Sequence, residues 1–279
     1  MADDTVLSIE RQGTVATLWL DRPEARNAMG PAFWDQLPSA MGELSADPEV
    51  RAVVLAARGP HFSVGLDLKA VGEMIPTPSD GGGDGRRTST AGRAVAARAG
   101  ILRMQQSVTS VAACPKPVVA AVHGYCIGGG VDVISACDIR LASADAVFSV
   151  RETKIAIVAD LGSLQRLPGI INRGHVAELA YTGKDIDAQR ACQIGLVNDV
   201  YPDAEAVQAA ARALAAEIAA NSPLAVQGTK AVLRAGEGRS VAEGLDYVAT
   251  WNAGFLQSDD LTEAFAAFLE KREPKFGGR

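Results

Sequence analysis

The stretch Pro117-Val118-Val119-Ala120-Ala121-Val122-His123-Gly124-Tyr125-Cys126-Ile127-Gly128-Gly129-Gly130-Val131-Asp132 decides the fold of this chain. Its apolar residues 118–122 predict a strand that is buried on both faces of a sheet. The strand breaks at Gly124, and the apolar residues after the three consecutive glycines predict a buried helix. The stretch therefore predicts a strand, a glycine turn and a helix in succession.

The three consecutive glycines, residues 128–130, remove every side chain from the mouth of the predicted helix. A ligand can then approach the first N–H groups of the helix, which have no partner inside it and carry the positive end of its dipole. Such a mouth can hold an anion, or an oxygen that becomes negative during a reaction, with the carboxylate of Asp132 nearby. A plain turn with a favourable first-turn acid explains the same residues equally well. The spacing fits neither a P-loop nor a dinucleotide-binding glycine motif.

A similar alternation precedes this stretch. Two strands within residues 6–20 form a predicted hairpin, followed by a helix over 31–44, an apolar strand over 53–56 and a second glycine turn over 59–69. Shorter strands and helices continue to residue 203. Alternation of this kind predicts an α/β fold with parallel strand pairing.

We expect the chain to have two parts, an α/β core over residues 1–203 and a helical subdomain over 204–279. The subdomain is rich in strong helix formers, and its helices are predicted over 204–220, 226–234, 241–256 and 262–271. Their apolar faces exceed what one small bundle buries, which indicates packing between subunits.

Residues 75–93 differ from the rest of the core, because they are rich in glycine and polar residues and cannot bury apolar surface. The segment is predicted as a loop before a helix over 94–111. The loop is either a tolerated surface insertion or a lid.

Composition narrows the function. The chain has 279 residues and a formal net charge of −6, which disfavours general affinity for nucleic acid or anionic membranes. No apolar run approaches a membrane span, and the acidic N-terminus is unlike a signal peptide. The C-terminal residues 276–279 are not a peroxisomal address, so we expect a cytosolic protein. Four scattered cysteines and three separated histidines lack metal-ligand spacing, and no metal site is expected.

Two segments resemble the signatures of the crotonase (enoyl-CoA hydratase/isomerase) superfamily. The first is Phe62-Ser63-Val64-Gly65-Leu66-Asp67-Leu68-Lys69, and the second is the stretch from His123 to Asp132. The resemblance extends over residues 6–276. It implies a crotonase-like spiral of ββα units, a C-terminal helical region that builds a homotrimer or homohexamer, and an acyl-CoA thioester substrate. No separate cofactor is implied, because CoA is part of the substrate.

The resemblance also assigns residues to the site. The thioester oxygen would accept hydrogen bonds from the backbone N–H groups of Leu66 and Gly129, which form an oxyanion hole. The positions that would bind substrate or CoA are Arg26, Ala28, Val64, Asp67, Leu68 and Lys69. Two of these have alternative interpretations: Lys69 as a solvated surface lysine, and Asp67 as a turn acid.

Three acids indicate a branch of the superfamily. Asp132, Glu152 and Asp160 together resemble the Δ3,5-Δ2,4-dienoyl-CoA isomerases of fatty-acid β-oxidation, whereas hydratases have glycine at the third position. By this resemblance Glu152 is the base at C2, Asp160 is the acid at C6, and Asp132 orients or polarises them. Taken alone, Asp160 would be interpreted as a loop acid or helix cap. Three acids in one apolar pocket should titrate as a coupled set, with at least one raised pKa.

Other functions remain open at this point. An enoyl-CoA hydratase would use Glu152 and Asp132 to add water to a trans-2-enoyl-CoA. A noncatalytic acyl-CoA-binding homologue would keep the oxyanion hole without turnover, and a thioesterase or dehalogenase relative would share the hole.

Overall fold

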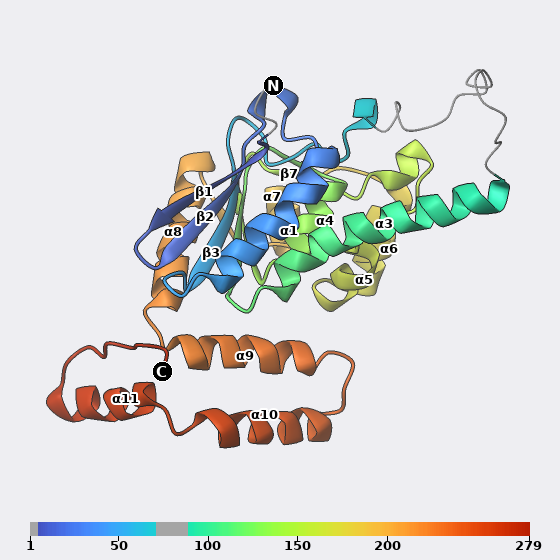
Figure 1. Ribbon diagram of the computed structural model, residues 1–279. Coiled ribbons are helices and arrows are strands. Elements are labelled where there is room, and N and C mark those ends of the chain that lie inside the picture. The colour runs from blue at the N-terminus through green and yellow to red at the C-terminus, as the bar shows by residue number, and fades with distance from the viewer. Residues whose placement is uncertain (1–4, 71–88) are drawn as a thin grey trace.

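A computed structural model describes residues 5–70 and 89–279 of the chain, and its main body is built on a six-stranded sheet (Figure 1). The strand order is β1-β2-β3-β4-β6-β9. The strands are β1 Leu7–Gln12, β2 Val15–Leu20, β3 Ala52–Ala57, β4 Val118–Val122, β6 Ile139–Ser143 and β9 Asp199–Tyr201. β1 and β2 pair antiparallel, and every other neighbouring pair is parallel. The predicted α/β fold with parallel pairing is confirmed.

A second, three-stranded sheet has the order β5-β7-β8. It consists of β5 Tyr125–Ile127, β7 Val147–Ser149 and β8 Ile186–Asp187. β5 and β8 are not predicted from the sequence, because two or three residues show no periodicity. β5 starts directly after Gly124, which has a φ of +54° and packs against the backbone of Pro60, so only glycine fits this turn.

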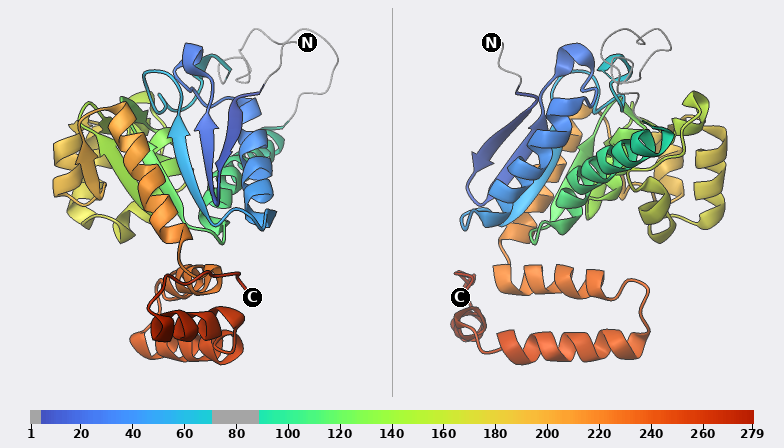
Figure 2. Two further views of the ribbon diagram at one scale, coloured as in Figure 1. Left: turned by 90° about the vertical axis from the view of Figure 1, so that its left-hand side faces the viewer. Right: turned by 45° about the vertical axis from the view of Figure 1, so that its right-hand side comes forward.

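Helices cover both faces of the large sheet (Figure 2). The helices of the core are α1 Pro31–Ala46, α3 Thr90–Ala113, α4 Gly129–Ser135, α5 Ser163–Arg166, α6 Arg173–Thr182, α7 Ala188–Gln193 and α8 Ala204–Ala219, with 3-10 turns η1 Pro23–Ala25, η2 Glu152–Ile155 and η3 Leu167–Gly169. The bounds of α1 and α8 agree with the predicted ranges 31–44 and 204–220 within two residues, whereas those of α3 differ.

α3 begins earlier than the sequence analysis placed it. The side chain of Ser89 accepts a hydrogen bond from Gly92 N and caps the helix, which then runs from Thr90. The predicted loop is therefore wrong for residues 90–93, where Gly92 interrupts the helical pattern of the sequence. The other residues of the predicted loop, 75–88, lie outside the described residues, and so does the lid that was considered for them.

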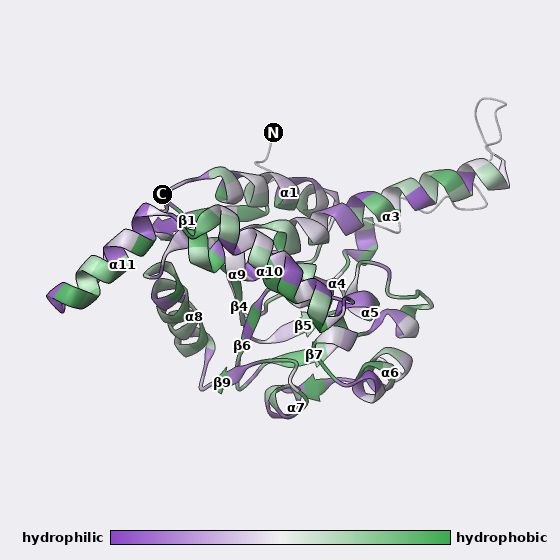
Figure 3. Ribbon diagram, turned by 90° about the horizontal axis from the view of Figure 1, so that it is seen from below, coloured by the Kyte–Doolittle hydropathy of each residue, from purple (hydrophilic) through white to green (hydrophobic). Residues whose placement is uncertain are grey.

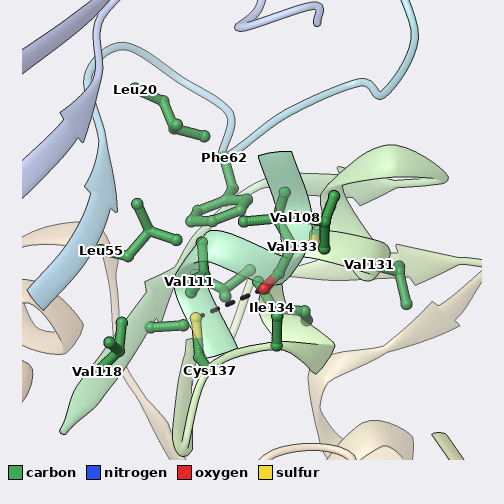
Figure 4. Packing of buried hydrophobic residues seen from close by; sticks show 14 of the residues in the cluster. Leu20, Leu55, Phe62, Val108, Val111, Val118, Val131, Val133, Ile134 and Cys137 are labelled. Carbon is green, nitrogen blue, oxygen red and sulfur yellow. Dashed lines mark hydrogen bonds between the residues drawn. The ribbon is translucent and has the colours of Figure 1, made fainter. Parts of the chain in front are cut away.

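The apolar core lies between the large sheet and the helices α1, α3 and α4. Figure 4 shows Phe62, Val111 and Ile134 pointing toward one another from three separate segments. All three side chains are fully buried, and burial of each contributes about 2 kcal/mol. This packing holds α4, the helix after the three consecutive glycines, against the glycine segment 59–69.

α8 packs on the opposite face of the sheet. Its buried residues recur every four positions and contact β2, β3, β4 and β6; they are Val207, Ala211, Ala215 and Ala219. The predicted division between residues 203 and 204 therefore falls before a helix that packs with the core sheet.

The remaining helices, α9 Pro223–Ala235, α10 Val241–Phe255 and α11 Asp259–Glu270, lie below this body (Figure 1). α9 is joined to the core by Lys230, a buried side chain whose Nζ lies 2.6 Å from Asp138 Oδ2. α10 has no buried residue, and Figure 3 shows hydrophobic residues along α10 and α11. Within residues 5–70 and 89–279, no helix combines the length and apolar character needed to cross a membrane.

Candidate active site

A cavity of about 690 Å³ opens between α1, α3, α4 and the segment after β7. Its lining is mainly apolar, and it includes every residue to which the sequence analysis gave a catalytic or oxyanion role: Leu66, Gly129, Asp132, Glu152 and Asp160. The fold thus collects five positions that span almost a hundred residues of sequence. Cavities of this size and character are typical small-molecule sites.

Two backbone segments meet at one wall of the cavity. Gly65 has a φ of +83°, and a Cβ there would lie 2.6 Å from the carbonyl oxygen of Ile127. A side chain at Gly129 would contact the Met29 Sδ at 3.0 Å. Glycine at both positions lets the Leu66 and Gly129 segments approach closely. Among the described residues, no acceptor is bonded to the N–H of Leu66 or of Gly129.

Buried polar side chains keep this wall in place. Ser63 Oγ donates to the backbone oxygen of Asn27 at 2.7 Å and accepts from Gly65 N at 3.0 Å. Asn27 has a φ of +53°, and its side-chain nitrogen donates to the carbonyls of Arg58 and His61. Neither Ser63 nor Asn27 was given a role from the sequence, although Ser63 lies in the first signature segment and Asn27 lies between Arg26 and Ala28, two predicted substrate positions.

Asp132 lies in the first turn of α4 and is 1% exposed. Its Oδ1 accepts a hydrogen bond of 2.6 Å from the backbone N–H of Ser163, where α5 begins. Burial raises the pKa of Asp132 to about 6, and the Ser163 hydrogen bond offsets part of that rise. Asp132 therefore ties α4 to the segment that carries Asp160.

Glu152 is the first residue of η2. Its Oε2 is buried and has no hydrogen-bond partner among the described residues. A Cβ at Gly128 would lie 3.1 Å from Glu152 Oε1, so the first of the three consecutive glycines leaves room for this carboxyl group. Burial, together with a smaller contribution from the nearby charges of Asp132 and Asp160, raises the pKa of Glu152 to about 7.

Asp160 lies in the segment between η2 and α5, on the same cavity as Glu152. It is half-buried, and this burial raises the pKa of its carboxyl group. Between the two acids, Ile155 and Ile157 line the cavity, whereas Val158 is 74% exposed.

The predicted substrate positions separate into two groups. Val64, Asp67 and Leu68 line the cavity, whereas Arg26, Ala28 and Lys69 do not. Arg26 and Lys69 are exposed. Asp67 Oδ2 accepts a 2.9 Å bond from Arg22, which lowers the Asp67 pKa, and Oδ1 accepts from Lys69 N. The Asp67 carboxylate thus stabilises its own turn.

No group of three or more His, Cys, Asp or Glu side chains within the described ranges is placed to hold a metal ion. The four cysteines are free thiols, and those at 114, 126 and 137 are buried. The charged residues that line the cavity are Asp67, Asp132, Glu152, Asp160, Arg93, Arg103 and Arg151.

Comparison with known proteins places this geometry in a family. The family model described as enoyl-CoA hydratase/isomerase matches residues 10–279. The chain belongs to the enoyl-CoA hydratase/isomerase family. One relative in this family, the peroxisomal Δ(3,5)-Δ(2,4)-dienoyl-CoA isomerase of Arabidopsis thaliana, is 43% identical over 97% of this chain and 96% of its own.

A second relative, the mitochondrial Δ(3,5)-Δ(2,4)-dienoyl-CoA isomerase of Dictyostelium discoideum, is 43% identical over 99% of this chain and 92% of its own. Among solved structures, the putative enoyl-CoA hydratase of Streptomyces coelicolor A3(2) superposes with a TM-score of 0.87 at 32% identity. That match covers 100% of this chain and 96% of the other. The crotonase fold expected from the sequence is confirmed.

These relatives contradict the cytosolic location expected from the sequence, because the two isomerases are named as peroxisomal and mitochondrial. The expectation rested on N-terminal residues that are unlike a signal peptide and on C-terminal residues that are not a peroxisomal address. Neither observation excludes an organelle, which the names of the two relatives favour.

Proposed function

We propose that this protein is a Δ3,5-Δ2,4-dienoyl-CoA isomerase of fatty-acid β-oxidation. One observation carries the proposal: Asp160 shares a cavity with Asp132 and Glu152, in a chain that is 43% identical to two isomerases of that name over nearly its whole length. A third carboxyl group extends the acid–base machinery beyond what addition of water at C2 and C3 requires.

The backbone N–H groups of Leu66 and Gly129 form the proposed oxyanion hole. Removal of a C2 proton turns the thioester carbonyl into an enolate oxygen, to which two N–H donors bind more strongly than to the neutral carbonyl. A donor of this kind contributes about 3–4 kcal/mol to catalysis. The proposed position of the oxyanion hole is supported by the close approach of Gly65 to the backbone of Ile127 and Gly129.

Two carboxyl groups then move the proton. The ionised Glu152 takes a proton from C2, which gives a dienolate spread along the acyl chain. The protonated Asp160 donates a proton to C6, and the double bonds shift from the 3,5 to the 2,4 positions without net loss of atoms. Glu152 releases its proton and Asp160 regains one before the next turnover. Raised pKa values on both acids support this exchange near neutral pH.

Asp132 supports the two acids without contacting the reacting carbons in this scheme. Its carboxylate holds the N-terminus of α5 through Ser163 and raises the pKa of Glu152. An apolar acyl chain in the cavity would displace water and raise the pKa of Asp160 again, which favours its proton-donating form.

The CoA portion would extend along the side of the cavity formed by Val64, Asp67 and Leu68. Arg26 and Lys69 are exposed cations on the two adjoining segments, where they can meet the CoA phosphates. Ala28 lies on the same turn as Arg26. The reaction is a proton transfer within the substrate, so the proposal needs no cofactor other than the CoA that the substrate carries.

We also propose a homotrimer or homohexamer built through α9, α10 and α11. Large apolar side chains are exposed on these helices, among them Leu233, Leu245, Phe265, Phe268 and Leu269. Apolar surface of this extent is typical of subunit interfaces.

A hydratase is the second candidate, because the Streptomyces coelicolor structure with the same fold carries that title. The test follows the purified protein in the ultraviolet with 3,5-octadienoyl-CoA and, separately, with crotonyl-CoA. The dienoyl substrate should be converted to the conjugated 2,4-product, and crotonyl-CoA should be hydrated far more slowly.

Asp160→Asn keeps the size of the side chain and removes the acid. Isomerisation should fall roughly 10²–10⁴-fold, whereas the exposed Asp35→Asn should retain the rate of the parent protein. An Asp160→Asn variant as fast as the parent would remove the isomerase mechanism and favour the hydratase. Turnover of neither substrate would indicate a noncatalytic acyl-CoA-binding protein.

A further inference from the structure

A single side chain of α3 is bonded to the backbone of the proposed proton donor. Gln105 Nε2 donates to the carbonyl oxygen of Asp160 at 2.6 Å, across 55 residues of sequence. A carbonyl oxygen only accepts hydrogen bonds, so the amide nitrogen of Gln105 must face it. The contact fixes the main chain at the residue whose carboxyl group enters the cavity.

The segment that carries Asp160 has few other restraints. Between η2 and α5 it forms no regular element, and Ile157 and Val158 are exposed to 37% and 74%. Only Ala159 and Leu161, on either side of Asp160, are buried. Burial therefore restrains the neighbours of Asp160, whereas the hydrogen bond from Gln105 on α3 restrains the main chain of Asp160 itself.

A second contact from the same face of α3 holds the next residues. Arg166 bridges Leu161 O, at 3.2 Å, and Thr109 Oγ1, at 3.1 Å. Thr109 is four residues after Gln105, so both lie on one face of the helix. α3 also lines the cavity with Ala97, Gly100 and Ile101, one to two turns before Gln105. The same helix thus shapes the acyl cavity and holds the acid segment.

We propose that Gln105 is a positioning residue that sets the reach of the Asp160 carboxyl group toward the distal end of the acyl chain. The inference rests on the proposed isomerase function. Glu152 lies on η2, and within the described residues no hydrogen bond joins it to Gln105. Loss of the Gln105 contact should therefore impair proton return at C6 and leave proton removal at C2 largely intact.

The experiment measures both proton transfers in the same protein. Exchange of the C2 proton of 3,5-octadienoyl-CoA with deuterated water reports Glu152, and formation of the 2,4-dienoyl product reports Asp160. In Gln105→Leu, product formation should fall roughly 10–100-fold, as expected for a displaced catalytic group. C2 exchange should change less than about threefold, and KM should change little.

Gln106→Leu is the matched control, because Gln106 is the next residue on α3 and is exposed. It should match the parent protein in both rates. Gln105→Glu is a second variant, for use if Gln105→Leu folds poorly. It keeps the shape of the side chain but places a carboxylate against the Asp160 carbonyl, so it should show the same selective loss of product formation.

A double-mutant cycle completes the test. With Asp160→Asn already present, Gln105→Leu should cause no further loss, since the acid that it positions is gone. Equal loss of exchange and product formation, or additive losses in the double mutant, would overturn the role of Gln105. A parent protein that does not isomerise the dienoyl substrate would instead overturn the proposed function.

Discussion

At the scale of single residues, the environment of the acids decides what they can do. The carboxyl groups of Asp132 and Glu152 are ordinary in water, but burial in an apolar cavity moves their pKa values to about 6 and about 7. Asp160, which is less buried, has a pKa raised in the same direction. Three acids with different exposure can therefore hold different protonation states near neutral pH.

The first prediction concerns the dependence of activity on pH. Glu152 must be ionised to take the C2 proton, and its pKa of about 7 means that acidification from pH 8 to pH 6 protonates it. We expect kcat/KM for isomerisation to fall through this range, with an acidic limb near pH 7. Steady-state assays in buffers of constant ionic strength measure it. A flat profile between pH 6 and pH 8 would exclude Glu152 as the base.

The second prediction concerns stability. The pKa of Asp132 is about 6 in the folded chain and 3.8 ordinarily, so its protonated form favours folding and that stabilisation is lost as the pH rises from about 4 to about 6. At about 1.4 kcal/mol per pH unit, the loss is about 3 kcal/mol. Asp132→Asn keeps an oxygen for Ser163 N–H and cannot ionise.

We therefore expect Asp132→Asn to raise the thermal unfolding midpoint at pH 8 and to leave it nearly unchanged at pH 4. Differential scanning calorimetry at the two pH values provides the comparison. The exposed Asp35→Asn should not show this difference. An Asp132→Asn protein that is destabilised at pH 8 would mean that the ionised carboxylate is needed for the Ser163 contact.

At the scale of elements, the site depends on short segments rather than on long helices. β5 is three residues long and α4 is seven, yet together they position the three consecutive glycines, residues 128–130, and Asp132. An isolated bridge between Ser63 and Cys126 attaches the glycine segment 59–69 to β5, and another between Met29 and Leu66 attaches it to the residues before α1. Small backbone shifts here would move the proposed oxyanion donors directly.

The third prediction tests this with Gly65→Ala. The added Cβ would lie 2.6 Å from Ile127 O, at a φ of +83°, so the chain before Leu66 must shift. We expect kcat and C2 exchange to fall together, by roughly 10²-fold or more, since both need the oxyanion hole. Gly13→Ala is the control, because it carries a similar positive φ with nothing within 4 Å of the added Cβ. Near-parent exchange in a folded Gly65→Ala would remove the Leu66 N–H from the mechanism.

At the scale of the whole molecule, α9, α10 and α11 show more apolar surface than a stable monomer usually exposes. On α11, Phe265 and Phe268 are 63% and 80% exposed. α9 is tied to the core through Lys230 and Asp138, and Asp138 Oδ2 also accepts from Val118 N at the start of β4. The position of α9 is therefore coupled to β4, the strand that leads to the site.

The fourth prediction is that the doubly substituted Phe265→Glu, Phe268→Glu protein forms smaller assemblies than the parent. Each buried phenylalanine contributes about 2–3 kcal/mol, which two carboxylates would remove and oppose. Light scattering after size-exclusion chromatography should give a trimer or hexamer for the parent and a lower mass for the variant. Gln106→Glu adds charge on α3 and should leave the mass unchanged. A parent protein that is monomeric at micromolar concentration would contradict the prediction.

The sequence by itself determined the longer strands and helices and the residue types that reach the site. The strands at 53–56 and 118–122 were readable because their apolar runs are local, and the glycines before Asp132 predicted a turn that only glycine fits. The acids were named from their order along the chain. The short strands β5 and β8 were missed because two or three residues show no period.

Only the tertiary structure decided how these parts meet. The contacts of Gln105 with Asp160 and of Ser163 with Asp132 join residues 55 and 31 positions apart, and no local pattern specifies such pairs. Protonation states also depend on the fold, because a pKa changes only when packing removes water from the carboxyl group. Local propensity therefore sets the elements, whereas long-range packing sets the distances and charges on which the chemistry depends.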